Sequence, residues 1–151
     1  MQDFDEKVKL CVDLLCSNSI LVLATQGEDG PYTSLMAYSC TSDGREIYML
    51  SSKKSQKWVN IQNNPQVSLL VDDRDGKLKQ NRSSIKALTV TGEFIKIDAE
   101  KKDTIMKHFA IDNPEINSSF SGPDCDIICI KATSFLLLDG PQQAFHSGKL
   151  L

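Results

Sequence analysis

The sequence has no long apolar run. Within its 151 residues no apolar stretch approaches the ~20 residues that a membrane-spanning helix needs, and the first ten residues, MQDFDEKVKL, are too polar for a secretory signal. We therefore expect a cytoplasmic protein with no membrane partner. An excess of positive charge is also lacking, because the formal net charge is −3 and the pI is near 5.3. This acidic balance argues against electrostatic binding of nucleic acid.

Recognisable cysteine and glycine motifs are absent as well. The cysteines are odd in number, and their spacings fit neither a CxxC redox pair nor a zinc ribbon. Free thiols in a reducing compartment are the simpler interpretation, and a redox or metal role is the alternative; no metal site is predicted. The glycines of a Walker loop are missing, so an NTP cradled in such a loop is not expected. The cysteines are Cys11, Cys16, Cys40, Cys125 and Cys129.

Local patterns predict six strands and three helices in a single domain, residues 1–151. Because the strands come in runs and do not alternate with helices, a parallel sheet is disfavoured. The expected fold class is mainly β with α (α+β), a small antiparallel β-barrel with peripheral helices. The strands are expected at residues 20–25, 31–41, 46–51, 66–73, 85–97 and 125–139. The helices are expected at residues 4–16, 55–63 and 99–110, with a short helical piece continuing to Phe120.

Two residues carry specific structural expectations. Ser55 is suited to cap the helix at 55–63, because its side-chain oxygen can accept from an unpaired N–H of the first turn. Gly92 lies in the middle of the strand at 85–97, where it predicts a bulge or a close backbone approach.

One window of this acidic chain contains no acid. From Ile47 to Val71 there is no Asp or Glu, yet Lys53, Lys54 and Lys57 all lie there. The window covers the end of a predicted strand, a turn rich in hydroxyl groups and the start of a helix. A solvated lysine face on an ordinary capped helix is one interpretation.

The other interpretation of this window is an anion site. The first N–H groups of a helix are unpaired, and the helix dipole adds partial positive charge at that end. Such a site suits a phosphate group. Lys57 would add a full charge, and Ser51 and Ser55 would add hydroxyl donors.

The order of three segments resembles a known family. The segments are ILVLATQGEDGPYTSLM, DGREIYMLSSKKSQKWVNIQNNPQVSLLV and ALTVTGEFIKI. Together they resemble the FMN-binding split β-barrel family that includes pyridoxamine 5′-phosphate oxidase, and most of all its short general-stress-protein-like branch. The resemblance covers residues 5–97 well and the last strand loosely. It implies a six-stranded split barrel and a homodimer with one FMN in each of two clefts at the subunit interface.

The resemblance also implies which residues hold the phosphate of the FMN. A strand-end Thr or Ser of the family meets the phosphate, and an Arg-Lys pair of the oxidases follows on the helix. Here the second position of that pair is a lysine but the first is a glutamine, so one charge is missing and the other lysines of the window are candidates to replace it. The resemblance assigns Ser51, Gln56 and Lys57 to the phosphate, and the position of Ser52 and Ser55 at the strand end and helix start adds them to the predicted site.

A second group is implied to run along the isoalloxazine ring. Ser34, Leu35 and Met36 occupy the strand whose backbone groups reach the ring edge, and Met36 either packs on the ring face or fills the core. The oxidases carry Arg at the position of Ser34 and Gln at that of Ala87. Their substrate-binding Arg on a Trp-rich C-terminal strand has no counterpart in FLLLDGPQQAFHSGKLL. Oxidation of pyridoxamine phosphate is therefore not expected.

These residues favour an FMN-dependent oxidoreductase acting on a small-molecule substrate or electron acceptor, although they identify no catalytic residue. Tyr32 and Tyr38 are the nearest proton donors in sequence, and a purely structural role is open for both. The alternative is a non-catalytic module of the same fold that holds FMN, haem or a deazaflavin. Haem would need an axial ligand, for which only His108 and His146 exist. A barrel with an empty site that serves dimer-mediated interaction is the third possibility.

Overall fold

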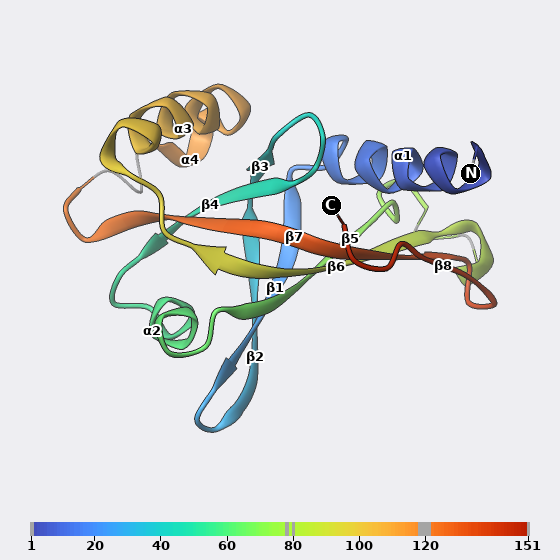
Figure 1. Ribbon diagram of the computed structural model, residues 1–151, viewed down its shortest axis with the longest axis horizontal. Coiled ribbons are helices and arrows are strands. Elements are labelled where there is room, and N and C mark those ends of the chain that lie inside the picture. Colours follow the sequence, from blue (N-terminus) through green and yellow to red (C-terminus); the bar gives the residue numbers. More distant parts are fainter. Residues whose placement is uncertain (1, 78, 80, 118–121, 151) are drawn as a thin grey trace.

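The computed structural model describes residues 2–77, 79, 81–117 and 122–150 (Figure 1). The helices in these residues are α1 (Gln2–Cys16), α2 (Gln56–Asn63), α3 (Ala99–Asp112) and α4 (Pro114–Asn117), with a 3-10 turn η1 (Arg82–Ser84). The strands are β1 (Ile20–Gly27), β2 (Gly30–Ala37), β3 (Ser39–Cys40), β4 (Glu46–Ser52), β5 (Gln66–Asp72), β6 (Lys86–Ile95), β7 (Cys125–Asp139) and β8 (Gln143–His146). None of these helices is long and apolar enough to cross a membrane.

One antiparallel sheet contains all eight of these strands. Its order is β2-β1-β5-β6-β7-β4-β3, with β8 added beside β7. The two ends of this path, β2 and β3, are consecutive in the chain with only Tyr38 between them, so the sheet curls until the chain joins its own two edges. The predicted mainly-β α+β class and the curled antiparallel sheet are confirmed.

The described residues form eight strands where six were predicted, for two reasons. The predicted strand at 31–41 is two strands. Before Tyr38 the chain pairs with β1, and after Tyr38 it pairs with β4. The tail after residue 139, where no strand is predicted, adds β8 to the edge of β7. The predicted helical piece after Asn113 is α4, and its continuation to Phe120 lies outside the described residues.

The barrel interior is the main hydrophobic core. It contains inward-facing residues of β1, β4, β5, β6 and β7, and α1 covers one end of it with the fully buried Cys11 and Leu15. A second cluster lies outside the barrel, where Ile105 and Phe109 of α3 pack on Tyr48 of β4 and on the outer face of β7. The helices α1 and α3 thus each bury one apolar face against the sheet.

The expected irregularity at Gly92 is confirmed. The register of β6 against β7 shifts between Thr91 and Gly92. A Cβ atom on Gly92 would lie 2.6 Å from Cγ2 of Ile130 and 2.8 Å from the carbonyl oxygen of Lys131. Only glycine therefore allows β6 to approach β7 this closely at the bend.

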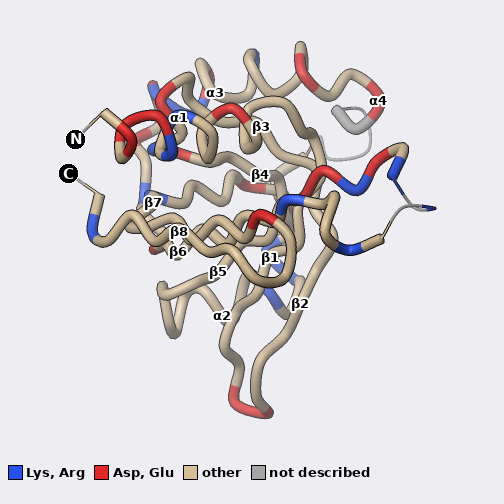
Figure 2. Tube along the Cα trace, turned by 90° about the vertical axis from the view of Figure 1, so that its right-hand side faces the viewer, with Lys and Arg blue, Asp and Glu red and all other residues tan. Residues whose placement is uncertain are grey.

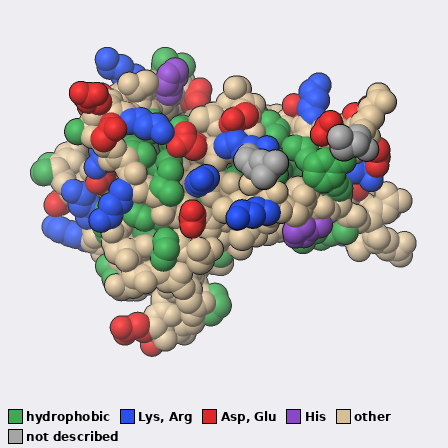
Figure 3. Space-filling view, in the orientation of Figure 1, with side chains coloured by type: hydrophobic (Ala, Val, Ile, Leu, Met, Phe, Trp, Pro, Cys, Tyr) green, Lys and Arg blue, Asp and Glu red, His purple; other side chains and the backbone are tan. Residues whose placement is uncertain are grey.

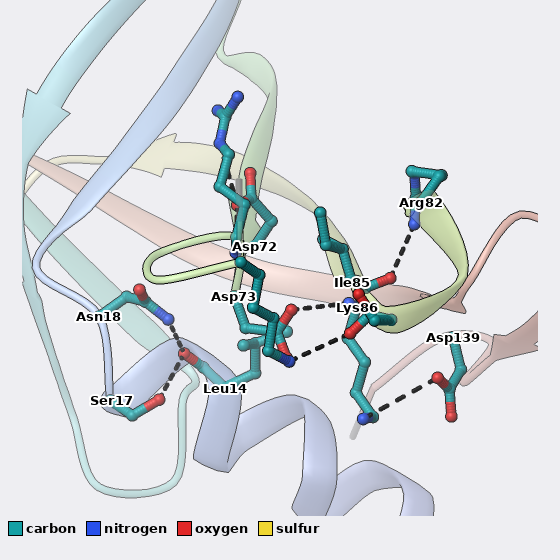
Figure 4. A network of polar contacts seen from close by, with 12 residues as sticks. Leu14, Ser17, Asn18, Asp72, Asp73, Arg82, Ile85, Lys86 and Asp139 are labelled. Atoms are coloured by element: carbon teal, nitrogen blue, oxygen red, sulfur yellow. Dashed lines mark hydrogen bonds and ion pairs between the residues drawn. The ribbon is translucent and has the colours of Figure 1, made fainter. Parts of the chain in front are cut away.

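Figure 4 shows polar contacts in the loop after β5 and at the end of α1. Asp73 accepts hydrogen bonds from the backbone N–H of Lys86 at 2.7 Å and from Nζ of Lys77 at 3.0 Å. At the end of α1, Ser17 and Asn18 donate side-chain hydrogen bonds to the carbonyl oxygen of Leu14. Both sets of contacts satisfy backbone groups that the ends of regular elements leave unpaired.

Candidate functional site

The corner where β4 ends and α2 begins is built by a helix cap. Ser55 has an extended backbone (φ −76°, ψ 153°), and its Oγ accepts a hydrogen bond from the N–H of Trp58 at 3.4 Å. The predicted capping role of Ser55 is confirmed. The end of β4 is held in place by β7, with Ser51 opposite Asp126 and Ser52 opposite Cys125.

Two serine hydroxyls of this corner shape the turn. Oγ of Ser51 lies 2.9 Å from Oγ of Ser55, and both hydroxyls donate to the carbonyl oxygen of Ser52, at 3.0 and 2.8 Å. Ser51 is only 1% exposed. The buried hydroxyl of Ser51 therefore stabilises the turn, and it is not available to a ligand in solvent.

The groups with spare donor capacity lie at the start of α2. Within the described part of the chain, the backbone N–H groups of Gln56 and Lys57 have no hydrogen-bond acceptor, as expected for the first turn of a helix. Oγ of Ser52 accepts from the N–H of Lys54 at 3.1 Å, and its own proton meets no acceptor among those residues. Two amides and a hydroxyl are thus free to bind an anion.

The lysines of this corner are not equivalent. Nζ of Lys53 lies 3.9 Å from a carboxylate oxygen of Asp126, and Nζ of Lys54 lies 3.4 Å from one of Asp124. Lys57 has no ion pair with a described residue, so it carries the uncompensated charge of the corner. The segment 47–71 contains no acid, but the pairing of β4 with β7 brings Asp124 and Asp126 next to its lysines.

The side chain of Gln56 is hydrogen-bonded within α2 and does not point to the free donors at the start of the helix. Its Nε2 donates to Oδ1 of Asn60 at 2.7 Å, and Nδ2 of Asn60 donates to Oγ1 of Thr25 at 3.0 Å. Asn60 is 3% exposed, and a Cβ on Gly27 would lie 2.8 Å from its Oδ1. Gln56 and Asn60 therefore tie the start of α2 to β1. Sequence reasoning missed Asn60, since a single Asn within a helix gives no sign of a long-range partner.

The strand β2 has an open edge next to this corner. Between Gly30 and Ala37 it pairs with β1 alone among the described residues, and some of its Cα atoms lie within 8 Å of those of β4 and α2. The N–H of Tyr38 bonds the carbonyl of Ser19 at 3.0 Å. Since hydrogen-bonded and non-hydrogen-bonded pairs alternate in antiparallel strands, the backbone N–H and C=O of Leu35 point away from β1, toward the open edge.

The three predicted ring-side residues differ in where their side chains lie. Met36 is 8% exposed and belongs to the barrel core, so packing in the core accounts for it. The side chain of Leu35 is 73% exposed on the outer face, and that of Ser34 is half-buried. Met36 therefore supports a ligand site beyond this edge by holding the strand in place.

A groove of about 820 Å³ continues from the start of α2 along the β1–β2 hairpin. Gln56, Val59 and Asn60 form one wall, and Tyr32 belongs to the other. The hairpin projects from the body of the protein and carries acids at its tip (Figures 2 and 3). The groove therefore runs from Gln56, the first residue of α2, to the carboxylates of Glu28 and Asp29 at the tip of the hairpin.

Only one of the two candidate proton donors faces this groove. Tyr32 is 42% exposed and lines it. Tyr38 is 2% exposed, and its hydroxyl donates to the carbonyl oxygen of Leu15 in α1. Burial raises the pKa of Tyr38 above its ordinary range. Tyr38 is therefore a structural residue that joins the strand switch to α1.

The two histidines lie away from the corner. His146 pairs with Leu136 on β7, about 30 Å along that strand from Asp126 at ~3.3 Å per residue. Its Nδ1 accepts from the N–H of Gly148 at 2.9 Å. His108 is exposed on α3.

Comparison with known proteins places the chain in a family. The sequence model of the family described as pyridoxamine 5′-phosphate oxidase matches residues 7–138. The chain belongs to this family. A pyridoxamine 5′-phosphate oxidase homolog of Schizosaccharomyces pombe is 34% identical over 79 residues, which are 47% of this chain and 40% of that protein. The predicted membership is confirmed.

Solved structures of family-like proteins share the fold. General stress protein 26 of Bacillus anthracis has a TM-score of 0.65 at 17% identity and covers 95% of this chain and 98% of its own. A FAD-binding protein of Mesorhizobium loti has a TM-score of 0.69 at 19% identity, covering 85% and 91%. A heme binding protein of Mycobacterium smegmatis has a TM-score of 0.81 at 11% identity, covering 92% of this chain and 56% of that one. The fold is thus shared by proteins named for flavin and for haem.

Proposed function

We propose that this protein is a cytoplasmic flavoprotein that binds FMN between the open edge of β2 and the start of α2, and uses it to oxidise or reduce a small molecule. The observation that carries the proposal is the set of hydrogen-bond donors without a described acceptor where β4 ends and α2 begins. They lie near the open edge of β2, where some Cα atoms of β2 are within 8 Å of those of β4 and α2.

The corner suits the phosphate of FMN in chemistry and in charge. The N–H groups of Gln56 and Lys57, the hydroxyl of Ser52 and Nζ of Lys57 are all donors without a described acceptor. A phosphate dianion needs several such donors, and hydrogen bonds to a charged acceptor are the strong ones. Ser51 and Ser55 would hold the turn in shape without touching the phosphate.

The open edge suits the polar edge of the isoalloxazine ring. Leu35 presents one backbone N–H and one C=O there, and backbone groups of this kind need a partner when they are covered. The flavin supplies the redox chemistry when it is bound. The protein would anchor it, orient the ring and shape the groove in which a substrate meets it, with Tyr32 as the proton donor that faces this groove.

The substrate is proposed to differ from pyridoxamine phosphate. The segment that follows the bend of β7 contains neither Arg nor Trp, and the residue at the β2 position of the oxidase Arg is Ser34, so both arginines of the oxidases are missing. Without those cations the groove has no obvious partner for a second phosphate group. A small electron acceptor with little negative charge fits the acidic tip of the hairpin better, because like charges repel.

A homodimer is part of the proposal. The outer face of β2, β1 and β5 exposes a row of apolar side chains, with Leu35 opposite Val22 and Val22 opposite Leu70. Leu35 is 73% exposed, Leu70 39% and Ile20 56%. A contiguous apolar face of this kind commonly marks a protein interface. A second copy would cover it and complete the cleft at the open edge.

The test begins with the visible absorption spectrum of the purified protein and a fluorescence titration with FMN. We expect flavin bands, or saturable binding of added FMN. The variant Lys57→Glu should weaken FMN binding by about 10- to 150-fold, corresponding to about 1.5–3 kcal/mol for a lost charged hydrogen bond. The matched control is Lys107→Glu, which makes the same change on the exposed face of α3.

The titrations of the wild type and of Lys57→Glu test flavin binding and the position of the phosphate separately. Absence of FMN binding by the wild-type protein would reject the flavoprotein proposal. Equal affinity of wild type and Lys57→Glu would reject the phosphate corner while leaving flavin binding in place. An NAD(P)H oxidation assay over several acceptors then separates an oxidoreductase from the alternative, a module that holds its cofactor without turnover.

A further inference from the structure

Two cysteines from distant parts of the sequence meet at the top of the barrel. Cys16 is the last residue of α1, and Cys40 is the last residue of β3. Their Sγ atoms are 3.4 Å apart, and both are free thiols. Two sulfur atoms at this distance are in contact, and a disulfide requires them to close to about 2.05 Å.

The elements that carry the two thiols are fixed against each other. The hydroxyl of Tyr38, two residues before Cys40, donates to the carbonyl of Leu15, the residue before Cys16. On the other side, the turn at Gly44 packs against Val12 of α1, with 3.3 Å between a Cβ built on Gly44 and Cγ2 of Val12. The pairing of the thiols is therefore built into the docking of α1.

Solvent can reach the pair, in contrast to the cysteines buried in the core. Cys16 is exposed and Cys40 half-buried, whereas Cys11 and Cys129 are fully buried. Cys125 is half-buried and lies on β7 beside Ser52, at the opposite corner of the barrel. No other two cysteines of the described residues have their sulfur atoms within hydrogen-bond distance of each other.

We propose that Cys16 and Cys40 form a reversible, peroxide-sensitive disulfide that locks α1 onto β3. The sulfur of Cys16 attacks one oxygen of hydrogen peroxide as the thiolate, which gives a sulfenic acid and, after protonation, one water molecule. The sulfur of Cys40 then attacks that of Cys16, forming the S–S bond and releasing the hydroxyl group as a second water molecule. In total two thiols and one hydrogen peroxide give one disulfide and two water molecules. A dithiol reductant reverses the reaction by thiol–disulfide exchange.

The two thiols have separate roles in this sequence. Burial, and next the hydrogen bond between Cys40 and Cys16, raise the pKa of Cys40 to about 12, so Cys40 stays protonated. The exposed Cys16 is the atom that peroxide reaches first. Because the attacking species is a thiolate, the second step should be faster at higher pH. Disulfides of reducing compartments are mostly of this transient, redox-sensing kind.

The disulfide would change the protein in a measurable way. It would close a loop that contains β1 and β2, and it would hold α1 over the end of the core. Cross-links of this kind stabilise mainly by restricting the unfolded chain, so a rise in Tm of about 5–10 °C is expected for a domain of this size. The pair lies outside the FMN corner, and the inference stands whether or not the protein binds FMN.

The experiment treats the purified full chain with hydrogen peroxide, alkylates the remaining thiols, and maps the peptides by mass spectrometry without reduction. We expect the loss of two hydrogen atoms from the intact chain, a peptide pair joined through Cys16 and Cys40, the rise in Tm, and reversal of all three by dithiothreitol. The variants Cys16→Ser and Cys40→Ser should lose the joined pair and the rise in Tm. The control Cys125→Ser should keep both.

Two results would overturn the inference. One is the conversion of Cys16 to a sulfinic acid while Cys40 remains open to alkylation. The other is a disulfide between two chains in place of the internal one, seen as a doubled mass. Because the peptide map of the wild-type protein alone distinguishes these outcomes, the conclusion does not depend on how well the variants fold.

Discussion

Gln56 donates a hydrogen bond of 2.7 Å from Nε2 to Oδ1 of Asn60, one turn further along α2. Asn60 in turn donates a hydrogen bond to Thr25 of β1, so the first turn of the helix is anchored to the neighbouring strand. The residue that the family resemblance assigned to the phosphate thus has a different partner in this chain. This connection orients the corner that we propose for the phosphate, and Lys57 supplies its unpaired charge.

Loss of Asn60 should destabilise the whole domain. Asn60→Ala would leave the side-chain amide of Gln56 without its partner and the buried hydroxyl of Thr25 with only its 3.5 Å bond to the carbonyl oxygen of Tyr32, at a cost of about 1–3 kcal/mol. Urea unfolding measures this loss. Asn63→Ala is the matched control, since Asn63 is exposed and has no side-chain hydrogen bond to a described residue. Equal midpoints for the two variants would show that the network contributes nothing to stability.

Gln56→Arg should have opposite effects on ligand affinity and stability. A guanidinium at the start of α2 adds a charged donor for the phosphate, so we expect FMN to bind about three- to tenfold more tightly. The same change breaks the hydrogen bond to Asn60, which should cost about 1 kcal/mol in urea unfolding. Gln62→Arg adds the same charge to the exposed end of α2 and should change neither quantity. A gain in affinity by both variants would point to a general charge effect.

The sequence was sufficient for features governed by local contacts. The cap at Ser55 and the bulge at Gly92 depend on residues a few positions away or on the absence of a single Cβ atom, and both were predictable. The same holds for the ends of α2 and α3, where Asn-Pro pairs stop the helix.

Features governed by long-range pairing were not predictable in this way. The switch of partner at Tyr38 follows from closure of the sheet, and no local signal at 31–41 marks it. The approach of Asp124 and Asp126 to the lysine corner depends on the register of β4 against β7. The contact between Cys16 and Cys40 likewise depends on how α1 docks, which spacing along the chain does not reveal.

Leu35 should be critical for dimer formation. Its side chain lies at the end of the exposed apolar row across β2, β1 and β5. A glutamate there would bury an unpaired charge at the proposed interface, which is strongly unfavourable. We expect Leu35→Glu to elute as a monomer in size-exclusion chromatography at a concentration where the wild type elutes as a dimer.

A matched control exists on the other side of the protein. Ile111 is 77% exposed on α3, and Ile111→Glu should leave the dimer intact. If Leu35→Glu stays dimeric, or if Ile111→Glu is the variant that dissociates, then the outer face of β2, β1 and β5 is not the interface.

The turn between β3 and β4 should make stability depend on pH through Asp43. Oδ1 of Asp43 accepts from Oγ1 of Thr41 at 2.7 Å and from the N–H of Arg45 at 3.0 Å. The hydrogen bond from Thr41, and next that from Arg45, lower the pKa of this carboxyl in the folded protein. The folded state therefore favours the charged form. Its contribution is present above the ordinary carboxyl pKa of about 3.9 and is lost as the pH falls through the lower folded value.

Asp43→Asn isolates this charge, because an amide keeps the accepting oxygen but cannot ionise. At pH 7 we expect the variant to unfold at a lower urea concentration than the wild type, and the gap should close as the pH falls below about 4. Urea midpoints measured between pH 7 and pH 3 give the comparison. Asp13→Asn, on the exposed face of α1 and without a side-chain hydrogen bond to a described residue, should show no gap at either end of the range. A gap for Asp43→Asn that stays constant down to pH 3 would mean that the amide disturbs the turn by its shape, and that the charge of Asp43 has no part in the stability of the hairpin.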